Sequence, residues 1–563
     1  MAKNHDKYKN HSLEELINEL EALKEKKYGL VWDKKNSQEI LDAFVSWENM
    51  PENFTPKQFP VLKEVKNKEI ENDENKPVNL LIEGENYHSL AVLNFTHQNK
   101  VDVIYIDPPY NTGNQNFIFN DKFVDKEDPW RHSKWLSFME KRLNLAKKLL
   151  KNTGVIFVSI DDHEQAQLRL LCNEIFGEEN FIDSIIWKKT ENIKMDSKFL
   201  SQNKDYILCY RKSSKISEFA KEQSTIDRFK LEDEKSKYYL RKLDSLSSSY
   251  SKGMDYIIEH KGIKYYAGGS KEKYEQRQYE NPRKKAPTWL WSKKKYEEGL
   301  ANNEIIFKNG NIYNKVRYDG FAKKPFINIQ KLVSQQTAQK ELDEMFGKRV
   351  FDHPKPPQLI TWLISLIQNN ESAIILDFFA GSGTTGQAVL DLNKKDNGNR
   401  KFILCTNNEN NICTDVCYPR VGKVINGYKN SKSKKVAGLG GNLKYFKTDF
   451  VGSDSTDKNK RDLVNKSAEM ICVKEDIFDL IVDKGFDYKI YQKGKKFLGV
   501  IFDIDAIADF KKEAEKYEGS FVVYCFSYTE ATPEKEFKGL KNRYVLKPIP
   551  AVILRIYFEI FKK

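Results

Sequence analysis

The sequence predicts an α/β protein built on a doubly wound, Rossmann-like parallel sheet, with an inserted domain and a smaller α/β domain after it. Three observations support this fold class. Apolar, β-branched runs alternate with helical patterns, a glycine-rich turn joins one such run to a helix, and the alternation lapses between about residues 213 and 347 before it resumes. Regular alternation of strand and helix is typical of parallel sheets that carry helices on both faces.

The elements follow from local patterns along the first half of the chain. A helix is expected over residues 11–27, with Ser12 as a candidate N-cap, and a charged linker is expected over 64–77. The alternation then predicts a strand and turn at 79–86, strands at 101–106, 155–161 and 206–212, and helices at 87–96, 135–154 and 165–177.

The second half repeats this rhythm after the insert. It predicts a helix at 358–368, a strand–turn–helix unit at 373–393, a strand at 401–409, a linker at 430–441, and two further strands at 497–505 and 519–527. We therefore expect five parts: an N-terminal helical extension (1–75), a first half of the sheet domain (76–212), an insert (213–347), a second half (348–430), and a linker with a C-terminal α/β domain (431–563).

Composition narrows the class of protein. The chain has 563 residues, seven cysteines and a net charge of +13. It contains no apolar run of membrane-spanning length and no secretory signal, and the odd, scattered cysteines suit a reducing compartment, so we expect a cytoplasmic protein. The basic balance permits a polyanionic partner, although a Lys- and Asn-rich composition also follows from an AT-rich genome.

The glycine-rich turn is a candidate cofactor site. Gly381, Gly383 and Gly386 form a G-x-G-x-x-G pattern between a strand and a helix, where a backbone without Cβ atoms can approach a ligand closely. Glu409 closes the next expected strand, and a carboxylate there can bind both hydroxyls of a ribose. This arrangement suits several nucleoside cofactors, including NAD.

A second motif is more discriminating. The strand at 101–106 runs directly into Asp107, Pro108, Pro109 and Tyr110. An exocyclic amino group is a poor nucleophile because its lone pair is delocalised into the ring. If two acceptors accept hydrogen bonds from its N–H groups, the lone pair is freed from the ring. Asp107 and the carbonyl of Pro108 can supply these acceptors, and Tyr110 can stack on the base. Such a site positions an amine for methyl transfer.

The two motifs together resemble the amino-methylating DNA methyltransferases of bacteria. The tetrapeptide motif "DPPYNTG" comes first, then the irregular segment, then "FDHPKP", then "DFFAGSGTTG". This order is similar to the circularly permuted β class, and especially to the methylation subunits of type III restriction–modification systems and their solitary relatives. The resemblance extends over roughly residues 28–450. It implies a class I S-adenosylmethionine-dependent methyltransferase fold, and the aspartate form of the tetrapeptide favours adenine N6.

The resemblance also implies site residues. Asp107, Pro108, Pro109 and Tyr110 would be catalytic. S-adenosylmethionine would be bound by Asp377, Phe379, Ala380, Gly381, Ser382, Gly383 and Thr384, with its ribose on Glu409 and its methionine end near Lys355 and Pro356. Residues 83–86 would lie near its adenine or form a plain turn. We expect Asp107 and Gly381 to share one cleft.

The insert interleaves aromatic and basic residues. This pattern indicates either a solvated surface over a small core or contacts to DNA phosphates and bases. The candidates for DNA binding are Lys284, Lys285, Trp289, Trp291, Lys293 and Lys294, of which one or both tryptophans can be core. Family resemblance makes the insert a target-recognition domain. No metal site is expected: residues 161–163 suit a helix N-cap, and Cys413 and Cys417 lack a second pair.

The expected function is methyl transfer from S-adenosylmethionine to N6 of an adenine flipped out of double-stranded DNA. The alternatives are a cytosine-N4 methyltransferase, a NAD-dependent oxidoreductase and a non-catalytic DNA-recognition subunit. By analogy with type III systems, a restriction subunit and a homodimer are possible partners. No membrane partner is expected.

Overall fold

The computed structural model describes residues 12–13, 32, 58–73, 75–113, 118–119, 122–190, 199–223, 229–247, 250–280, 282, 285–318, 323–324, 326–330, 332–453, 456–527 and 531–561. The chain divides into two compact units, one formed by residues 1–219 and 327–563 and the other by residues 220–326. Most of the helix expected over 11–27 lies outside the described residues. Among the described residues, no helix is both long and apolar enough to cross a membrane.

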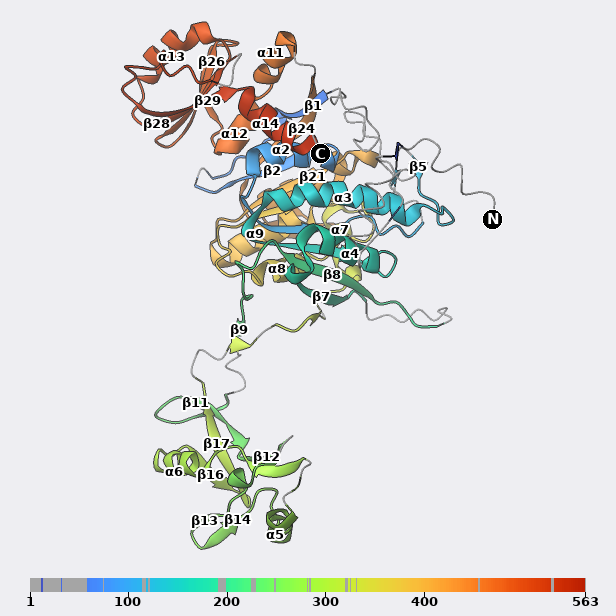
Figure 1. Ribbon diagram of the computed structural model, residues 1–563, viewed down its shortest axis with the longest axis vertical. Coiled ribbons are helices and arrows are strands. Elements are labelled where there is room, and N and C mark those ends of the chain that lie inside the picture. The colour runs from blue at the N-terminus through green and yellow to red at the C-terminus, as the bar shows by residue number, and fades with distance from the viewer. Residues whose placement is uncertain are drawn as a thin grey trace. The chain divides into compact units, whose positions relative to one another are not determined.

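The first unit is built on a ten-stranded sheet. The strands, in spatial order, are β1 (Gln58–Glu64), β24 (Asn442–Gly452), β2 (Val78–Glu83), β21 (Lys401–Thr406), β20 (Ile374–Asp377), β3 (Val101–Ile106), β6 (Leu150–Ile160), β8 (Lys204–Arg211), β7 (Phe181–Lys188) and β19 (Ile329–Gln330). The six strands from β24 to β6 are parallel, whereas β1 and β8 run antiparallel to their neighbours. Strands from the two ends of the chain therefore interleave, so that β2 lies between β24 and β21 (Figure 1).

Helices cover the sheet in two groups. One group contains α2 (Asn86–His97), α3 (Arg131–Leu149) and α4 (Gln165–Phe176), which contact one another in sequence order. The other contains α8 (Pro357–Ser365), α9 (Thr384–Asp396) and α10 (Tyr418–Asn426). A further helix, α7 (Gln335–Phe346), precedes α8. The sheet is thus doubly wound, as the alternation predicts.

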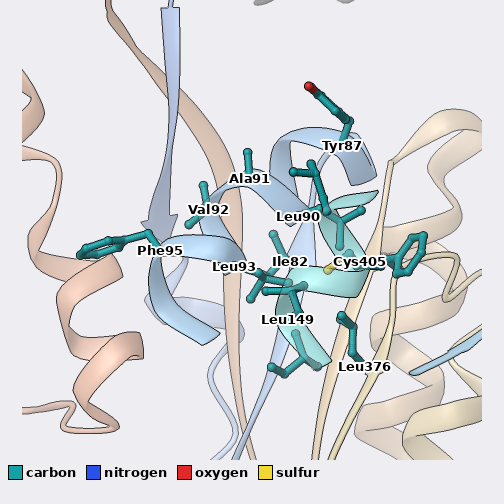
Figure 2. Packing of buried hydrophobic residues seen from close by; sticks show 14 of the residues in the cluster. Ile82, Tyr87, Leu90, Ala91, Val92, Leu93, Phe95, Leu149, Leu376 and Cys405 are labelled. Carbon is teal, nitrogen blue, oxygen red and sulfur yellow. The ribbon is translucent and has the colours of Figure 1, made fainter. Parts of the chain in front are cut away.

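The core explains why these segments form these elements. All twelve residues of α2 are buried, and its Leu90 and Leu93 pack with Ile82 of β2 and Leu376 of β20 (Figure 2). The strands are β-branched and apolar, and both of their faces are covered by helices, which is the pattern of interior parallel strands. Burial of this apolar surface stabilises the sheet by roughly 25 cal/mol per Å².

The strand order places a topological switch point at β20 and β3. The chain passes from β20 through α9 to β21 on one side, and from β3 through α3 to β6 on the other side. In open α/β sheets, ligands bind outside the carboxyl ends of the strands at such a point. The residues that follow β20 and β3 are therefore the natural place for a site.

The structure differs from the sequence expectation at both edges of this sheet. The segment expected as extension and linker contains an edge strand, β1, and the C-terminal part supplies β24 beside it. The strand at 206–212 is not parallel: β7 and β8 form an antiparallel hairpin because no helix separates them. Residues 335–346, which the sequence assigns to the insert, form the helix α7 and belong to the unit with the sheet.

The second unit, residues 220–326, carries a four-stranded antiparallel sheet in the order β10-β11-β17-β16. Its elements are β9 (Glu222–Gln223), β10 (Leu231–Glu232), β11 (Lys237–Lys242), β12 (Asp244–Ser247), β13 (Ile258–His260), β14 (Ile263–Tyr265), α5 (Lys271–Glu280), β15 (Ala286–Trp289), α6 (Lys293–Ala301), β16 (Ile305–Lys308), β17 (Asn311–Arg317) and β18 (Lys323–Lys324). Leu243, Ile258, Trp289 and Ile312 lie in its core.

The C-terminal part forms a five-stranded sheet in the order β25-β26-β27-β28-β29. Its elements are α11 (Asp457–Asn465), α12 (Ala468–Glu475), β25 (Asp479–Asp483), β26 (Tyr488–Lys493), β27 (Lys496–Ile501), α13 (Ile507–Ala514), β28 (Ser520–Phe526), β29 (Arg543–Ile549) and α14 (Ala551–Phe561). Both α12 and α14 contact α2, and the Tyr557 hydroxyl donates to the carbonyl of Pro60. Short strands β4 (Ile118–Phe119), β5 (Lys122–Phe123), β22 (Gly427–Lys429) and β23 (Lys435–Ala437) complete the fold.

Candidate functional site

The two sequence motifs end neighbouring strands. Strand β3 runs into Asp107 and strand β20 runs into the turn that contains Gly381. The two strands pair in parallel, with Ile375 opposite Val103 and Leu376 opposite Ile104. Since both strands end at the same edge, segments far apart in the sequence meet there.

The tetrapeptide after β3 is fixed by contacts from several elements. Trp135 of α3 donates its indole N–H to the carbonyl of Pro109 at 2.7 Å. The two prolines restrict the backbone further, because each ring fixes one φ angle. The carboxylate of Asp107 and the ring of Tyr110 are therefore presented in defined positions.

Lys355 contacts Asp107 directly. Its Nζ lies 2.7 Å from both carboxylate oxygens of Asp107 and 3.0 Å from the hydroxyl of Tyr110. The lysine side chain is only 7% exposed, so this ion pair is partly desolvated. Sequence resemblance predicts that Lys355 and Pro356 approach the cofactor; in the structure the ammonium group contacts the carboxylate of Asp107, and Pro356 precedes α8 as its N-cap.

A second carboxylate extends this network. Asp205, at the start of β8, is nearly fully buried; it accepts from Lys189 Nζ at 2.8 Å, and its Oδ2 lies 3.4 Å from the Tyr110 hydroxyl. Burial, with the negative charges of Asp107 and Asp205, raises the pKa of Tyr110 well above its ordinary value, so the phenol stays neutral. Sequence reasoning missed Asp205 and Lys189. The one available signal was a lone acid opening an otherwise apolar strand.

A cleft of about 1300 Å³ opens over the tetrapeptide. Its lining includes the tetrapeptide, Lys355 and Asp205, and also polar residues of α7, namely Gln335, Gln336, Gln339 and Lys340. Phe351, which also lines the cleft, is the nearest residue to a Cβ built on Gly381, at 3.5 Å. The glycine turn therefore adjoins the wall of the cleft through Phe351.

The glycine turn is shaped by backbone geometry. Gly381 and Gly383 have φ angles of +50° and +80°, and a Cβ on Gly383 would lie 3.1 Å from Cys417 Sγ. The amide of Gly383 donates to the carbonyl of Ala380 at 2.8 Å. Any other residue at position 383 is disfavoured both by the left-handed conformation and by the lack of space.

Asp377 organises the start of this turn. Its carboxylate accepts from the amide of Phe379 at 3.0 Å and from the hydroxyl of Thr385 at 2.5 Å. Burial raises the pKa of Asp377 to about 7, although these two hydrogen bonds oppose the shift. The carboxyl group of Asp377 therefore stabilises the turn through these two hydrogen bonds.

Ser382 and Thr384, expected among the cofactor-binding residues, direct their hydroxyls inward. Both hydroxyl oxygens accept from the guanidinium of Arg420 on α10 at 2.8 Å, and Gln387 on α9 accepts from the same group at 3.0 Å. Ser382, Thr384 and Arg420 are all nearly fully buried. Arg420 was not anticipated from the sequence, where it is a single basic residue near the start of a short helix.

Glu409 lies at the same edge of the sheet. It is exposed and begins a short 3₁₀ turn three residues beyond the end of β21, rather than closing the strand itself. Because β21 is parallel to β20, the two strands deliver Glu409 and the glycine turn to the same side. This position leaves the carboxylate accessible to a ligand.

Residues 83–86 form a strand end and a helix cap. Glu85 caps α2 and pairs with Arg142 Nη2 at 2.6 Å, while Asn86 donates to the carbonyl of Phe378 at 3.1 Å. Burial opposes ionisation of Glu85, but Arg142, His88 and the amide of Tyr87 outweigh it and lower its pKa. This network ties α2 and α3 to the end of β20.

The expected DNA-binding residues separate into two groups. Lys285, Lys293 and Lys294 are exposed, the last two in the first turn of α6. Trp289 is 3% exposed and donates to the carbonyl of Tyr256, so it belongs to the core of the second unit. Trp291 packs against the same core, and Lys284 lies outside the described residues.

The cysteines and acidic groups form no metal centre among the residues that the structure describes. All seven cysteines are free and buried. Asp161 accepts from the amide of His163 at 3.0 Å, a local turn contact just before α4.

Comparison with known proteins identifies the family. The model of the DNA methylase family N6_N4_Mtase matches residues 101–417, which include both motifs. The StyLTI Mod subunit, a type III restriction–modification protein of Salmonella typhimurium, is 35% identical over 354 residues, covering 58% of this chain and 52% of that protein. The EcoPI Mod subunit of Escherichia phage P1 is 33% identical over 408 residues, covering 65% and 62%.

A shorter relative is matched almost completely. The type II methyltransferase M.KpnI of Klebsiella pneumoniae is 32% identical over 391 residues, covering 65% of this chain and 90% of that protein. The chain thus matches under two thirds of the length of the two Mod subunits. Among solved structures, PvuII DNA methyltransferase (cytosine-N4-specific) has a TM-score of 0.31 at 10% identity, covering 62% of this chain and 92% of that chain.

Proposed function

This chain belongs to the N6/N4 DNA methylase family, and from that premise we propose that it transfers a methyl group from S-adenosylmethionine to N6 of adenine in double-stranded DNA. One observation carries the proposal. The carboxylate of Asp107 and the glycine turn stand at the ends of paired strands, at the switch point of the sheet. An amine held at the first would face a ligand held at the second.

The residues present fit S-adenosylmethionine. The positive-φ turn at Gly381 and Gly383 brings backbone without Cβ atoms to the sheet edge, and the accessible carboxylate of Glu409 follows the neighbouring strand. The turn would hold the cofactor through its backbone, and Glu409 would accept from the ribose hydroxyls. The bound cofactor supplies an electrophilic methyl group.

The tetrapeptide would act on the amine. Asp107 accepts one N–H of the target amino group, which localises the nitrogen lone pair and withdraws it from the ring. A carboxylate has about four lone-pair sites, so the contact with Lys355 leaves room for this bond. Tyr110, neutral and fixed by its neighbours, offers a ring face for stacking. The general contribution of such proton-handling groups is about 10²–10⁴-fold in rate.

The target base must leave the duplex. An adenine amino group in a stacked base pair cannot reach a carboxylate at the floor of a cleft, so the nucleotide is flipped at a cost of a few kcal/mol. Gln335, Gln336 and Gln339 of α7, which line the same cleft as the tetrapeptide, supply amide donors and acceptors. These groups can bond to polar edges of a flipped base.

The experiment is direct analysis of the product. Double-stranded DNA is incubated with the protein and methyl-labelled S-adenosylmethionine, hydrolysed, and its nucleosides are separated by mass. We expect N6-methyladenine. Detection of N4-methylcytosine instead would show that the protein is a cytosine-N4 methyltransferase. If the DNA is bound but carries no label, the protein is a non-catalytic recognition subunit.

A restriction partner is part of the proposal because two relatives are named as Mod subunits of type III restriction–modification enzymes. The same chemistry is compatible with a solitary enzyme, since M.KpnI is named as a type II methyltransferase. Purification of the tagged chain from its host distinguishes the two. A helicase or nuclease subunit that co-purifies in stoichiometric amount supports a restriction partner, and a chain that purifies alone supports a solitary enzyme.

A further inference from the structure

The residue that follows the tetrapeptide is held in an unusual conformation. Asn111 has a φ of +55° and is 1% exposed. Its amide Nδ2 donates to the carbonyl of Arg131 at 3.2 Å and to Glu164 Oε1 at 2.5 Å. Asparagine is one of the few residues that adopts the left-handed region, and here its side chain anchors the end of the tetrapeptide.

Glu164 comes from a separate part of the sheet. It follows β6 and precedes α4, and its side chain does not cap that helix but points to Asn111 and His132. Its carboxyl group is fully buried. The tetrapeptide after one strand is thus anchored by an acid after the next strand, since β3 and β6 are neighbours.

His132 has three side-chain contacts, with Arg131, with Glu164 and, at 3.4 Å from its Nδ1, with Gln167 Nε2. The two shorter contacts assign the ring proton. Arg131 Nε donates to His132 Nε2 at 3.1 Å, so Nε2 is an acceptor and the ring proton lies on Nδ1. Nδ1 lies 2.6 Å from Glu164 Oε1 and donates to it. Burial, with the positive charges of Arg131 and His163, lowers the pKa of His132 and keeps the ring neutral.

Two buried oxygens remain without a donor. Among the described residues, neither Glu164 Oε2 nor Asn111 Oδ1 has a hydrogen-bond partner. An ionised carboxylate with one oxygen buried and unbonded is costly, and so is a second unbonded acceptor on Asn111, the residue to which it is already hydrogen-bonded. If Glu164 is protonated on Oε2, this oxygen becomes a hydrogen-bond donor, and Asn111 Oδ1 can accept from it.

We propose that Glu164 is a positioning residue for the catalytic tetrapeptide and that it acts as a neutral carboxylic acid, accepting from Asn111 Nδ2 and His132 Nδ1 through Oε1 while its own O–H faces Asn111 Oδ1. The role in catalysis rests on the proposed methyl transfer. The protonation state is a property of the folded chain alone, so the two can fail separately.

The charges around Glu164 agree with this assignment. Burial raises the pKa of Glu164 to about 7; the contact with Asn111 and the charges of Arg131 and His163 oppose the shift, and Asp161 adds to it. Because the folded-state pKa is raised, the folded protein binds a proton here that the unfolded chain releases at lower pH. The associated stability is fully present below the ordinary pKa of 4.5, falls as the pH rises above that value, and is lost once the pH has passed about 7.

Kinetics test the positioning role with two variants. Glu164→Gln keeps a neutral side chain that accepts through one terminal atom and donates through the other, whereas Glu164→Ala removes both groups. We expect kcat of the wild type to decline between pH 7 and 8.5 as Glu164 loses its proton. The glutamine variant should retain kcat within about twofold at pH 6.5 and should lack this decline. The alanine variant should lose about tenfold in kcat at every pH, with the KM for DNA within threefold of wild type.

Thermal unfolding tests the protonation state without substrate. The Tm of Glu164→Gln relative to the wild type should rise between pH 5.5 and pH 8.5, while Glu297→Gln, an exposed control on α6, should show no pH-dependent difference. A glutamine variant that is as inactive as alanine, or a Tm difference that does not change with pH, would overturn the proposal. If the wild type does not methylate DNA, the proposed function fails and the unfolding result still decides the protonation state.

Discussion

The two loops that meet at the edge of the sheet are held by different means. The tetrapeptide after β3 is fixed by side chains from distant segments, with Lys355 on Asp107 and Trp135 on Pro109. The turn after β20 takes its shape from its own backbone, with Gly381 and Gly383 in the left-handed region, and Asp377 and Arg420 bind it from within the core. The first arrangement presents a charged side chain in a fixed position, and the second presents bare backbone. This difference supports the proposal that the first loop binds the reacting amine and the second binds the cofactor.

The sharpest way to break the glycine turn is Gly383→Asp. The left-handed backbone alone costs about 1–2 kcal/mol for a residue with a Cβ, and the new atom would lie 3.1 Å from Cys417 Sγ. We expect cofactor binding and methyl transfer to be lost together, as measured by calorimetry and labelled transfer. Gly310→Asp, a glycine with positive φ and open space in the second unit, is the matched control and should keep both.

Replacement of Arg420 tests whether the turn also depends on side chains. Arg420→Leu would leave the hydroxyls of Ser382 and Thr384 and the amide of Gln387 without their donor, at about 1–3 kcal/mol for each buried group left unsatisfied. We expect the KM for S-adenosylmethionine to rise about tenfold while kcat at saturation changes little. An unchanged KM in a folded variant would contradict a positioning role for this arginine.

Replacement of Lys355 tests the other loop. Lys355→Met removes the cation that contacts both oxygens of Asp107, so the carboxylate loses its fixed orientation. We expect kcat to fall about tenfold with cofactor affinity within threefold. Lys189→Met is the matched control because Lys189 contacts Asp205 rather than Asp107; it should lower kcat less than threefold. A large loss of cofactor affinity in Lys355→Met would instead show that Lys355 contributes to cofactor binding.

The smallest expected effects concern the exposed lysines of the second unit. Single alanine substitutions of Lys285, Lys293 or Lys294 should weaken DNA binding by a few fold. Each lysine that neutralises a phosphate should also reduce the salt dependence of binding by about one unit of slope when it is replaced. Anisotropy with labelled duplex at several salt concentrations measures both quantities. Variants with unchanged affinity and slope would remove these lysines from the DNA-binding surface.

The sequence predicts those parts of the fold whose signal is local. Each interior strand is an apolar run and each motif is contiguous, so β3 with its tetrapeptide and β20 with its glycine turn are found without a structure. The edge strand β1 could not be anticipated, since its partner β24 lies near the other end of the chain. The strands β7 and β8 form a hairpin but are apolar like the parallel strands. Only the absence of a helix between β7 and β8 distinguishes them in the sequence.

The supporting residues of the site escape sequence reasoning for the same reason. Asp205, Arg420 and Glu164 are single polar residues, each separated from its partner by many positions along the chain. A buried charge and an exposed one look identical in a sequence. Trp289 shows the reverse case: an aromatic residue beside lysines suggested a DNA contact, yet it fills the core of the second unit.

The decisive measurement is labelled methyl transfer to double-stranded DNA by Asp107→Ala, with cofactor binding determined on the same preparation. We predict that transfer falls by at least about 10²-fold while S-adenosylmethionine binds with near wild-type affinity, because the carboxylate serves the amine and not the cofactor. Asp509→Ala, an exposed aspartate of α13, should leave both unchanged. Normal transfer by Asp107→Ala would contradict the assignment of this carboxylate to the reacting amine.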